Sequence, residues 1–394
     1  MKKIENVELL APAGDMEKLK LALLYGADAV YLGGAEFGLR ASAPFNEEEL
    51  KEAVKLVHEA GRRIFVTVNI FARNNDFEPL IKYLKFLEEI KVDAVIVSDL
   101  GVLRAARENT GLEVHISTQA SVCNKFTAEE YIKLGAKRII LARELSLEEI
   151  KEIAQYLKGR ADVEVFVHGA MCVSYSGRCL LSDYMTDRAA NRGKCAQPCR
   201  YKYFVTEEKR PGELYEVEED KHGTYIFNSK DLCLIEHLDE LSEAGVGSFK
   251  IEGRMNSEYY VASVVNAYRR KMNGESDDFV TELKKTAHRE FTTGFVFGEK
   301  DKQKRDSSKS FQTHEIAALC LGDGKVVQKN VFEKGDILEV LSPGERFGEV
   351  VKVKKIIYES GEVVEKANKT AKVYKLDGIE GLKPGDILRK GVED

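Results

Sequence analysis

Residues 25–32 read YGADAVYL, and the phrase returns with small changes at 90–97 (IKVDAVIV), 134–141 (LGAKRIIL) and 244–251 (AGVGSFKI). Each copy ends an amphipathic stretch on a small residue and continues into a short apolar run, which is typical of a helix followed by a buried strand. Eight such apolar runs occur, at 7–11, 29–32, 64–68, 94–97, 114–117, 138–141, 163–167 and 249–251. Helical spacing of apolar residues lies between them, at 15–25, 46–60, 77–90, 100–109, 127–134, 146–157 and 231–244.

Short strands that alternate with helices predict parallel pairing through crossover helices. Eight such units close a (β/α)8 TIM-like barrel, which places the chain in the α/β class. An open doubly wound sheet is the alternative, but no G-x-G-x-x-G turn follows the first strand. Asp15 and Asp99 open two of the helical stretches, so an N-cap role is as good an interpretation of each as a catalytic one.

Two segments depart from the alternation of strands and helices. A Cys-rich insertion at about 170–230 follows the seventh strand, where a barrel loop is expected to flank the active-site mouth. A charged stretch, GEKDKQKRDSSKS, then precedes short β-type runs separated by turn signals. We therefore expect a barrel domain at 1–298, a linker at 299–311, and a small antiparallel β-barrel domain at 312–394.

Composition restricts the class of protein. The chain has 394 residues, 60 basic and 66 acidic side chains, and a formal net charge of −6. No apolar stretch approaches the roughly 18 uncharged residues of a membrane span, and no signal-like segment opens the sequence. We expect a cytoplasmic protein without a membrane partner, in which seven cysteines serve as metal ligands or buried thiols rather than disulfides.

Four cysteines lie close together in the insertion and a fifth follows it, with spacings C-x6-C, C-x15-C and C-x3-C before Cys233. These spacings match neither a zinc ribbon nor a ferredoxin. Clustered thiols indicate a shared cation, so an iron–sulfur cluster, a zinc ion and unligated thiols are the three alternatives. Cys123 and Cys320 lie in strand-like contexts and are interpreted as buried thiols.

Several longer blocks make the chain recognisable. They read ELLAPAGD (8–15), EVFVHGAMC (164–172), GRCLLS (177–182), NRGKCAQPCRYKY (191–203), FNSKDLCLIEHL (227–238) and FKIEGRMNSEYYV (249–261). Together they resemble the collagenase-like U-32 peptidase family over essentially the whole chain, with most similarity to its tRNA-uridine branch.

The resemblance implies an oxygen-independent hydroxylation that forms 5-hydroxyuridine at the wobble position of tRNA. It further implies prephenate, a small dicarboxylate, as the hydroxyl donor and a [4Fe–4S] cluster as the cofactor. The implied ligands are Cys172, Cys179, Cys195 and Cys233, with Cys199 as an alternative ligand.

Two other functions stay open. A peptidase would agree with the family name, although no H-E-x-x-H or G-x-S-x-G motif occurs. A non-catalytic partner that assembles with another family member, as a homo- or hetero-oligomer, is the third hypothesis.

Polar residues at the predicted strand ends supply the remaining candidates. For a dicarboxylate we expect the cations Arg143, Arg178 and Arg254, together with the strand-end amides Gln119 and Asn69. His168, Glu164 and Glu252 are the candidate catalytic residues. A structural histidine and ion pairs that brace the barrel explain these three equally well.

The insertion also carries a basic window with aromatic residues, as single-stranded RNA recognition requires. The expected RNA-binding residues are Arg188, Arg192, Lys194, Arg200, Tyr201 and Lys202. A solvated charge run is the alternative interpretation of this window.

Overall fold

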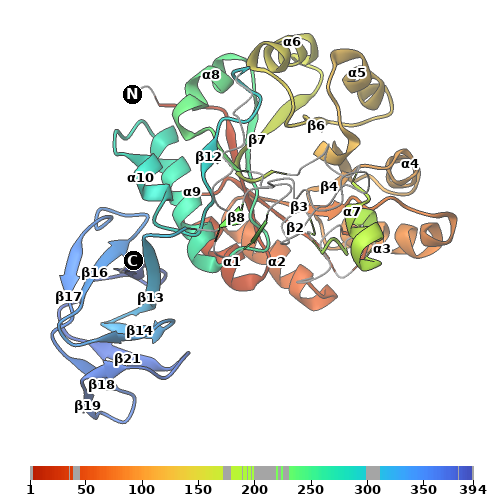
Figure 1. The fold of residues 1–394 in the computed structure, drawn as a ribbon. Coiled ribbons are helices and arrows are strands. Elements are labelled where there is room, and N and C mark those ends of the chain that lie inside the picture. The colour runs from red at the N-terminus through yellow and green to blue at the C-terminus, as the bar shows by residue number, and fades with distance from the viewer. Residues whose placement is uncertain are drawn as a thin grey trace, which may run out of the picture.

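The computed structural model describes residues 3–34, 36–38, 45–171, 179–188, 190–192, 194–196, 198, 219–220, 223–224, 230–298, 311–379 and 381–392. Eight parallel strands close into a barrel, because the last of them, β11, pairs with both β1 and β7 (Figure 1). They are β1 (Glu8–Pro12), β2 (Ala29–Leu32), β3 (Arg63–Val68), β4 (Ala94–Val97), β5 (Glu113–Ile116), β6 (Arg138–Ile140), β7 (Asp162–Ala170) and β11 (Ser248–Ile251). The predicted TIM-like barrel is confirmed.

Helices surround the barrel on the outside (Figure 1). They are α1 (Met16–Leu24), α2 (Glu47–Glu59), α3 (Phe77–Glu89), α4 (Leu100–Asn109), α5 (Lys125–Lys133), α6 (Leu147–Leu157), α8 (Leu238–Glu243) and α9 (Glu258–Met272). Asp15 and Asp99 accept hydrogen bonds from the first-turn amides of α1 and α4, so the N-cap interpretation holds for both. In the described parts of the chain, no helix combines the length and apolarity needed to cross a bilayer.

The segment at 231–244 differs from the predicted helix. It begins with strand β10 (Asp231–Cys233), continues through a 3-10 turn (Ile235–His237), and only then forms α8. β10 pairs antiparallel with the end of β7 and parallel with β12 (Phe291–Thr292). The helix predicted from the apolar spacing was wrong at 231–233. The backbone of β7 extends beyond the barrel and pairs with this segment, and a pairing partner so far away is not visible in the local sequence.

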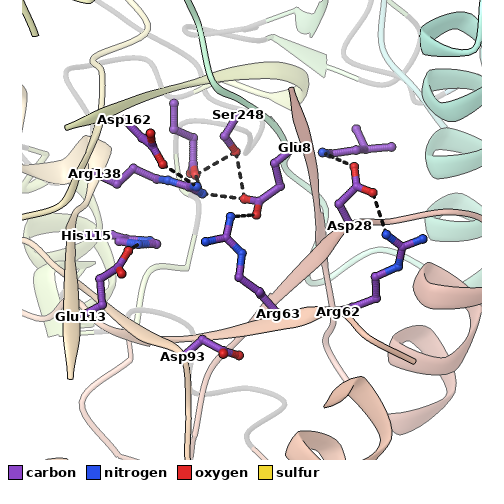
Figure 2. Close-up of polar contacts among 12 residues, drawn as sticks. Glu8, Asp28, Arg62, Arg63, Asp93, Glu113, His115, Arg138, Asp162 and Ser248 are labelled. Carbon is purple, nitrogen blue, oxygen red and sulfur yellow. Dashed lines mark hydrogen bonds and ion pairs between the residues drawn. The ribbon is translucent and has the colours of Figure 1, made fainter. Parts of the chain in front are cut away.

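A row of charged side chains, partly buried, lies at the amino-terminal ends of the barrel strands (Figure 2). Arg63 pairs with Glu8, and Arg138 Nη1 lies 2.6 Å from Glu8 Oε1 and 3.0 Å from Glu164 Oε2. Ser248 donates to Glu164 at 3.1 Å. Glu164 is fully buried and pairs across the barrel, which was the structural alternative for this residue.

Shorter elements complete the first unit. They are the 3-10 turns at Asn74–Asp76, Thr118–Ala120 and Ala190–Arg192, helices α7 (Leu181–Thr186) and α10 (Phe279–Leu283), and strands β8 (Glu219–Asp220) and β9 (Gly223–Thr224). α7 lies beside α3 in Figure 1, on the opposite side of the barrel from β12.

The carboxy-terminal unit is antiparallel, as predicted, and surrounds a second apolar core. Its sheet has the order β17-β16-β22-β13-β14-β21-β18-β19, and the edge strands β17 and β19 are not paired with each other in the described residues, so the sheet is open. The strands are β13 (His314–Gly322), β14 (Lys325–Gln328), β16 (Ile337–Leu341), β17 (Val350–Lys352), β18 (Ile356–Tyr358), β19 (Val363–Val364), β21 (Val373–Leu376) and β22 (Ile387–Gly391). A separate pair joins β15 (Phe332–Glu333) to β20 (Lys366–Ala367).

A buried arginine joins the two units. Arg389 of β22 is fully buried and donates to both carboxylate oxygens of Glu282 in α10, at 2.5 and 2.9 Å. The same guanidinium reaches Glu339 of β16 at 2.6 Å. Tyr25, at the end of α1, donates across the same interface to the carbonyl of Leu341 at 2.9 Å.

We expect Arg389→Met to destabilise the protein by about 3–5 kcal/mol, because two carboxylates would lose their shared cation in a buried interface. Urea unfolding, followed by circular dichroism, measures the change. The control is Arg346→Met, which removes a more exposed pair with Glu349 and should cost less than about 1 kcal/mol. Equal losses for the two variants would contradict the assignment of Arg389 as the junction.

Candidate active site at the barrel mouth

A cavity of about 640 Å³, its open mouth included, lies at the carboxyl ends of the barrel strands. Strand residues form its inner part and residues just beyond the strand ends form its rim. Its lining is Tyr31, Thr67, Asn69, Ile96, Ser117, Thr118, Gln119, Ile140, Arg143, Phe166, Lys250, Glu252 and Arg254. This is the position and size usual for the active site of a TIM barrel.

Four of the five predicted substrate-binding residues meet in this cavity: Asn69, Gln119, Arg143 and Arg254. The fifth, Arg178, lies outside the described residues. The sequence pattern placed the four on different strand ends, and closure of the barrel brings them together.

Arg254 is held by a specific close approach. Its Nη1 donates to Thr67 Oγ1 at 3.0 Å, and Thr67 in turn donates to the carbonyl of Leu32 at 3.1 Å. A Cβ at position 33 would lie 2.3 Å from Nη1, so only glycine leaves room for the guanidinium there. The GG pair after β2 is therefore part of the site.

Arg143 ties the cavity to the insertion. Its Nη1 donates at 2.8 Å to the carbonyl of Ala170, the last residue of β7, and its guanidinium lies 5.1 Å from the centre of the Phe166 ring. The side chain that lines the cavity thus also holds the start of the Cys-rich segment.

Glu252 faces the same cavity from the end of β11. The Tyr31 hydroxyl lies 3.1 Å from its Oε2. The backbone of Gly169 also lies close to Glu252. Gly169 has φ +104°, and a Cβ at position 169 would lie 2.6 Å from the carbonyl oxygen of Glu252. This explains the glycine in the VHGA block physically.

His168 and Cys233 lie side by side, because β10 pairs with β7 in the register Cys233↔His168. Burial is the main cause that lowers the pKa of His168 to about 3, so the imidazole is neutral near pH 7. The Tyr268 hydroxyl donates to the Val167 carbonyl at 2.7 Å and lies 3.3 Å from His168 Nδ1 and 4.0 Å from Cys233 Sγ. His168 does not line the cavity, so its position suits support of Cys233 better than contact with a substrate.

A second part of the insertion holds two further candidate ligands. The Leu181 amide donates to Cys179 Sγ at 3.4 Å, and the amide of Ala196, next to Cys195, donates to Ser182 Oγ at 3.0 Å. Cys179 and Cys195 therefore flank one small folded unit. Amide donors directed at sulfur suit a metal-bound thiolate.

Arg192 anchors this unit to the barrel. Its guanidinium donates to both carboxylate oxygens of Asp76, at 2.9 and 3.0 Å, and to the Phe71 carbonyl at 3.1 Å. The hydrogen bond from Arg192 is the main cause that lowers the pKa of Asp76. Arg192 thus positions the insertion at the loop after β3, while Arg188 and Lys194 are exposed.

The cysteine site is only partly described. No three His, Cys, Asp or Glu side chains converge in a geometry that could hold a metal ion within the described residues. Cys172, Cys199, Arg200, Tyr201 and Lys202 lie outside the residues that the structure describes. Of the predicted ligands the structure describes Cys179, Cys195 and Cys233, and the ligand set stays a prediction.

Three of the described thiols, those of Cys123, Cys233 and Cys320, do not resemble protease nucleophiles. Burial raises the pKa of Cys123, raises that of Cys233 to about 11, and raises that of Cys320 to about 12. A nucleophilic cysteine needs the opposite shift, toward a thiolate at neutral pH.

Tyr31, Thr67 and Lys250 are among the lining residues that sequence reasoning missed, because they lie within strands rather than after them. Lys250 left a signal, since it is a charged residue inside an otherwise apolar strand run.

The fold and the cavity place the chain among TIM-barrel enzymes, with a cationic mouth and a Cys-bearing insertion. Comparison with known proteins identifies the family. Residues 14–306 match peptidase family U32, and residues 313–389 match the peptidase family U32 C-terminal domain. The chain belongs to peptidase family U32.

Curated relatives carry different names. The chain is 39% identical to tRNA hydroxylation protein P1 of Bacillus subtilis, over 98% of this chain and 94% of that protein. It is 38% identical to an uncharacterized protease of Methanocaldococcus jannaschii, over 98% and 97% respectively. It is also 34% identical to the 23S rRNA 5-hydroxycytidine C2501 synthase of Escherichia coli, over 88% of this chain and 53% of that protein.

For prephenate, the ligand that the sequence resemblance implies, we expect Gly33→Ala to weaken binding roughly tenfold or more, because the new methyl group would displace the Arg254 guanidinium from the cavity. Isothermal titration calorimetry measures the affinity. Gly391→Ala is the matched control, because nothing lies within 4 Å of a Cβ there. Unchanged affinity in Gly33→Ala would show that Arg254 does not contact the ligand.

Proposed function

We propose that the chain is an RNA-modifying enzyme that hydroxylates tRNA, forming 5-hydroxyuridine at the wobble position. The observation that carries the proposal is the meeting of Arg143, Arg254, Asn69 and Gln119 in one cavity, with both ends of the Cys-rich insertion joined at β7 beside it. The names of the Bacillus subtilis and Escherichia coli relatives support a hydroxylation of RNA.

The cavity would hold the hydroxyl donor, a small dicarboxylate such as prephenate. Guanidinium groups bind carboxylates through paired, charge-assisted hydrogen bonds, so Arg143 and Arg254 are the expected partners. Asn69 and Gln119 present amide groups to hydroxyl or carbonyl oxygens of the same ligand. Glu252, whose Oε2 lies 3.1 Å from the Tyr31 hydroxyl, is the carboxylate in the cavity lining and the candidate proton acceptor.

The RNA would approach across the insertion. Arg188 and Lys194 are exposed there, and Arg200, Tyr201 and Lys202 are further expected contacts. An anticodon loop presents its bases largely unstacked, so a wobble uridine reaches a barrel mouth at low cost. We place the activity in the cytoplasm, where tRNA is found, and an assembly with another family member is compatible with it.

We further propose a [4Fe–4S] cluster on Cys172, Cys179, Cys195 and Cys233, with Cys199 as the alternative ligand and zinc as the alternative metal. A bound cluster would supply electron-transfer or Lewis-acid chemistry close to the cavity. The chain's own residues there contribute two features. A buried, neutral His168 lies next to Cys233, and the Leu181 amide donates to Cys179 Sγ.

The function is tested in a bacterial host that lacks its own tRNA hydroxylation proteins. Expression of the chain should restore 5-hydroxyuridine-derived nucleosides in digested tRNA, measured by mass spectrometry, whereas Arg254→Met should fail to restore them. Arg346→Met, which replaces a surface arginine far from the cavity, should behave as the wild type. If the chain instead restored 5-hydroxycytidine in 23S rRNA and left tRNA unmodified, the substrate would be rRNA and not tRNA.

The cofactor is tested by metal analysis of anaerobically purified protein. We expect about four iron and four sulfide per chain, lost in Cys179→Ala and retained in Cys123→Ala. Cys123 serves as the control because its sulfur lies 3.4 Å from the Ser121 carbonyl, away from the other candidate thiols in sequence. One zinc ion and no sulfide would make the insertion a structural zinc site.

A further inference from the structure

We propose that Lys250 forms an anion subsite at the floor of the barrel cavity, separate from the arginines at its rim, and that it binds one carboxylate of the ligand. The cavity would then favour molecules that carry two carboxylates over molecules that carry one. The inference deepens the proposed function, since it concerns the donor that the same cavity would hold.

The register of the sheet places Lys250 inside the barrel. It lies in β11 between Leu10 of β1 and Phe166 of β7, its direct neighbours in the parallel ladder. Arg254 comes three residues after the end of β11, and Arg143 comes three residues after the end of β6. The lysine is therefore a floor residue and the two arginines are rim residues of one cavity.

The wall between floor and rim is largely apolar. Ile96, Ile140 and the ring of Phe166 line it, and the Lys250 Nζ lies 4.3 Å from the centre of the Tyr31 ring. A ligand in this cavity thus has apolar side chains beside its hydrocarbon part.

Lys250 keeps donors for such a ligand. Its side chain is almost completely buried, and within the described residues its one hydrogen-bond acceptor is Glu164 Oε1, at 3.0 Å. An ammonium group carries three donors. Since Lys250 lines the cavity, a bound carboxylate would accept from the donors that Glu164 does not use.

Lys250 is the last charge in a row of ion pairs. The order is Arg63, Glu8, Arg138, Glu164 and Lys250, and Figure 2 shows the part around Arg63, Glu8 and Arg138. Arg63 is exposed at one end of this row, whereas Lys250 is almost completely buried at the other end. Asp162 pairs with Arg138 at 3.2 Å, but this carboxylate is largely exposed. Glu164 is thus shared between Arg138 and Lys250, and a ligand carboxylate would complete the compensation of the lysine charge.

Glu164 is the positioning residue of this subsite. Burial opposes its ionisation, but the charges of Lys250 and Arg138 outweigh burial and lower its pKa. Its ion pair with Lys250, at 3.0 Å between Oε1 and Nζ, holds the end of the lysine side chain in place at the floor of the cavity.

The test compares prephenate with phenylpyruvate, a keto acid with one carboxylate, by isothermal titration calorimetry on the full-length protein. The wild type should bind prephenate roughly 10- to 100-fold more tightly. In Lys250→Met this preference should fall to about one, because the floor no longer distinguishes the two ligands. Lys133→Met, an exposed helix lysine paired with Glu130, is the control and should keep the preference.

Two further variants keep the test decisive. Glu164→Gln should weaken prephenate binding less than Lys250→Met does, because the ammonium remains but loses its anchor. If Lys250→Met does not fold, the double variant Glu164→Gln/Lys250→Met removes both charges together and should also lose the preference.

The proposal is overturned if the preference survives in Lys250→Met or in the double variant. It is also overturned if cyanoborohydride traps either keto acid on Lys250 as a covalent adduct, since a fixed ammonium does not form an imine. Both measurements need no RNA, so a failure of the tRNA hydroxylation assay leaves their interpretation intact.

Discussion

The ion chain inside the barrel is the constraint on which the rest of the structure depends. Glu8, Arg138 and Glu164 come from three different strands and are nearly or completely removed from water. A buried charge is tolerated only when it is paired and hydrogen-bonded, so each of these strands must lie in one register for the others to be satisfied. The same chain ends on Lys250, which makes the floor of the cavity a consequence of how the barrel closes.

Above this floor, small residues decide where the functional groups lie. Gly33 leaves room for the Arg254 guanidinium, and Gly169 lets the end of β7 approach Glu252. Beyond Gly169 the strand leaves the barrel and takes β10 as an antiparallel partner, which brings Cys233 back beside His168. β7 therefore contributes Phe166 to the cavity and also carries the start of the Cys-rich insertion.

The small β unit is tied to this scaffold through polar contacts as well as through packing. Arg389 satisfies one carboxylate from each side of the junction, Glu282 and Glu339, while Leu341 and Ile387 join the apolar core of the barrel. Such an interface holds the two units in a fixed relation, because separation would remove Glu282 from the fully buried Arg389 guanidinium. One face of the carboxy-terminal β unit, the face with Arg389, Leu341 and Ile387, therefore lies against the barrel.

The sequence by itself determined the barrel, its eight strand positions and the antiparallel second unit, because hydrophobic periodicity is a local property. It also indicated the strand-end residues Asn69, Gln119, Arg143 and Arg254, because strand-end polarity is local as well. Only the tertiary structure decided that Asp231–Cys233 is a strand, that Glu164 is an internal ion-pair partner, and that Lys250 faces the cavity. Each of these depends on a partner far away in the chain. No local pattern encodes which buried lysine meets which carboxylate, since that is settled by the register in which the barrel closes.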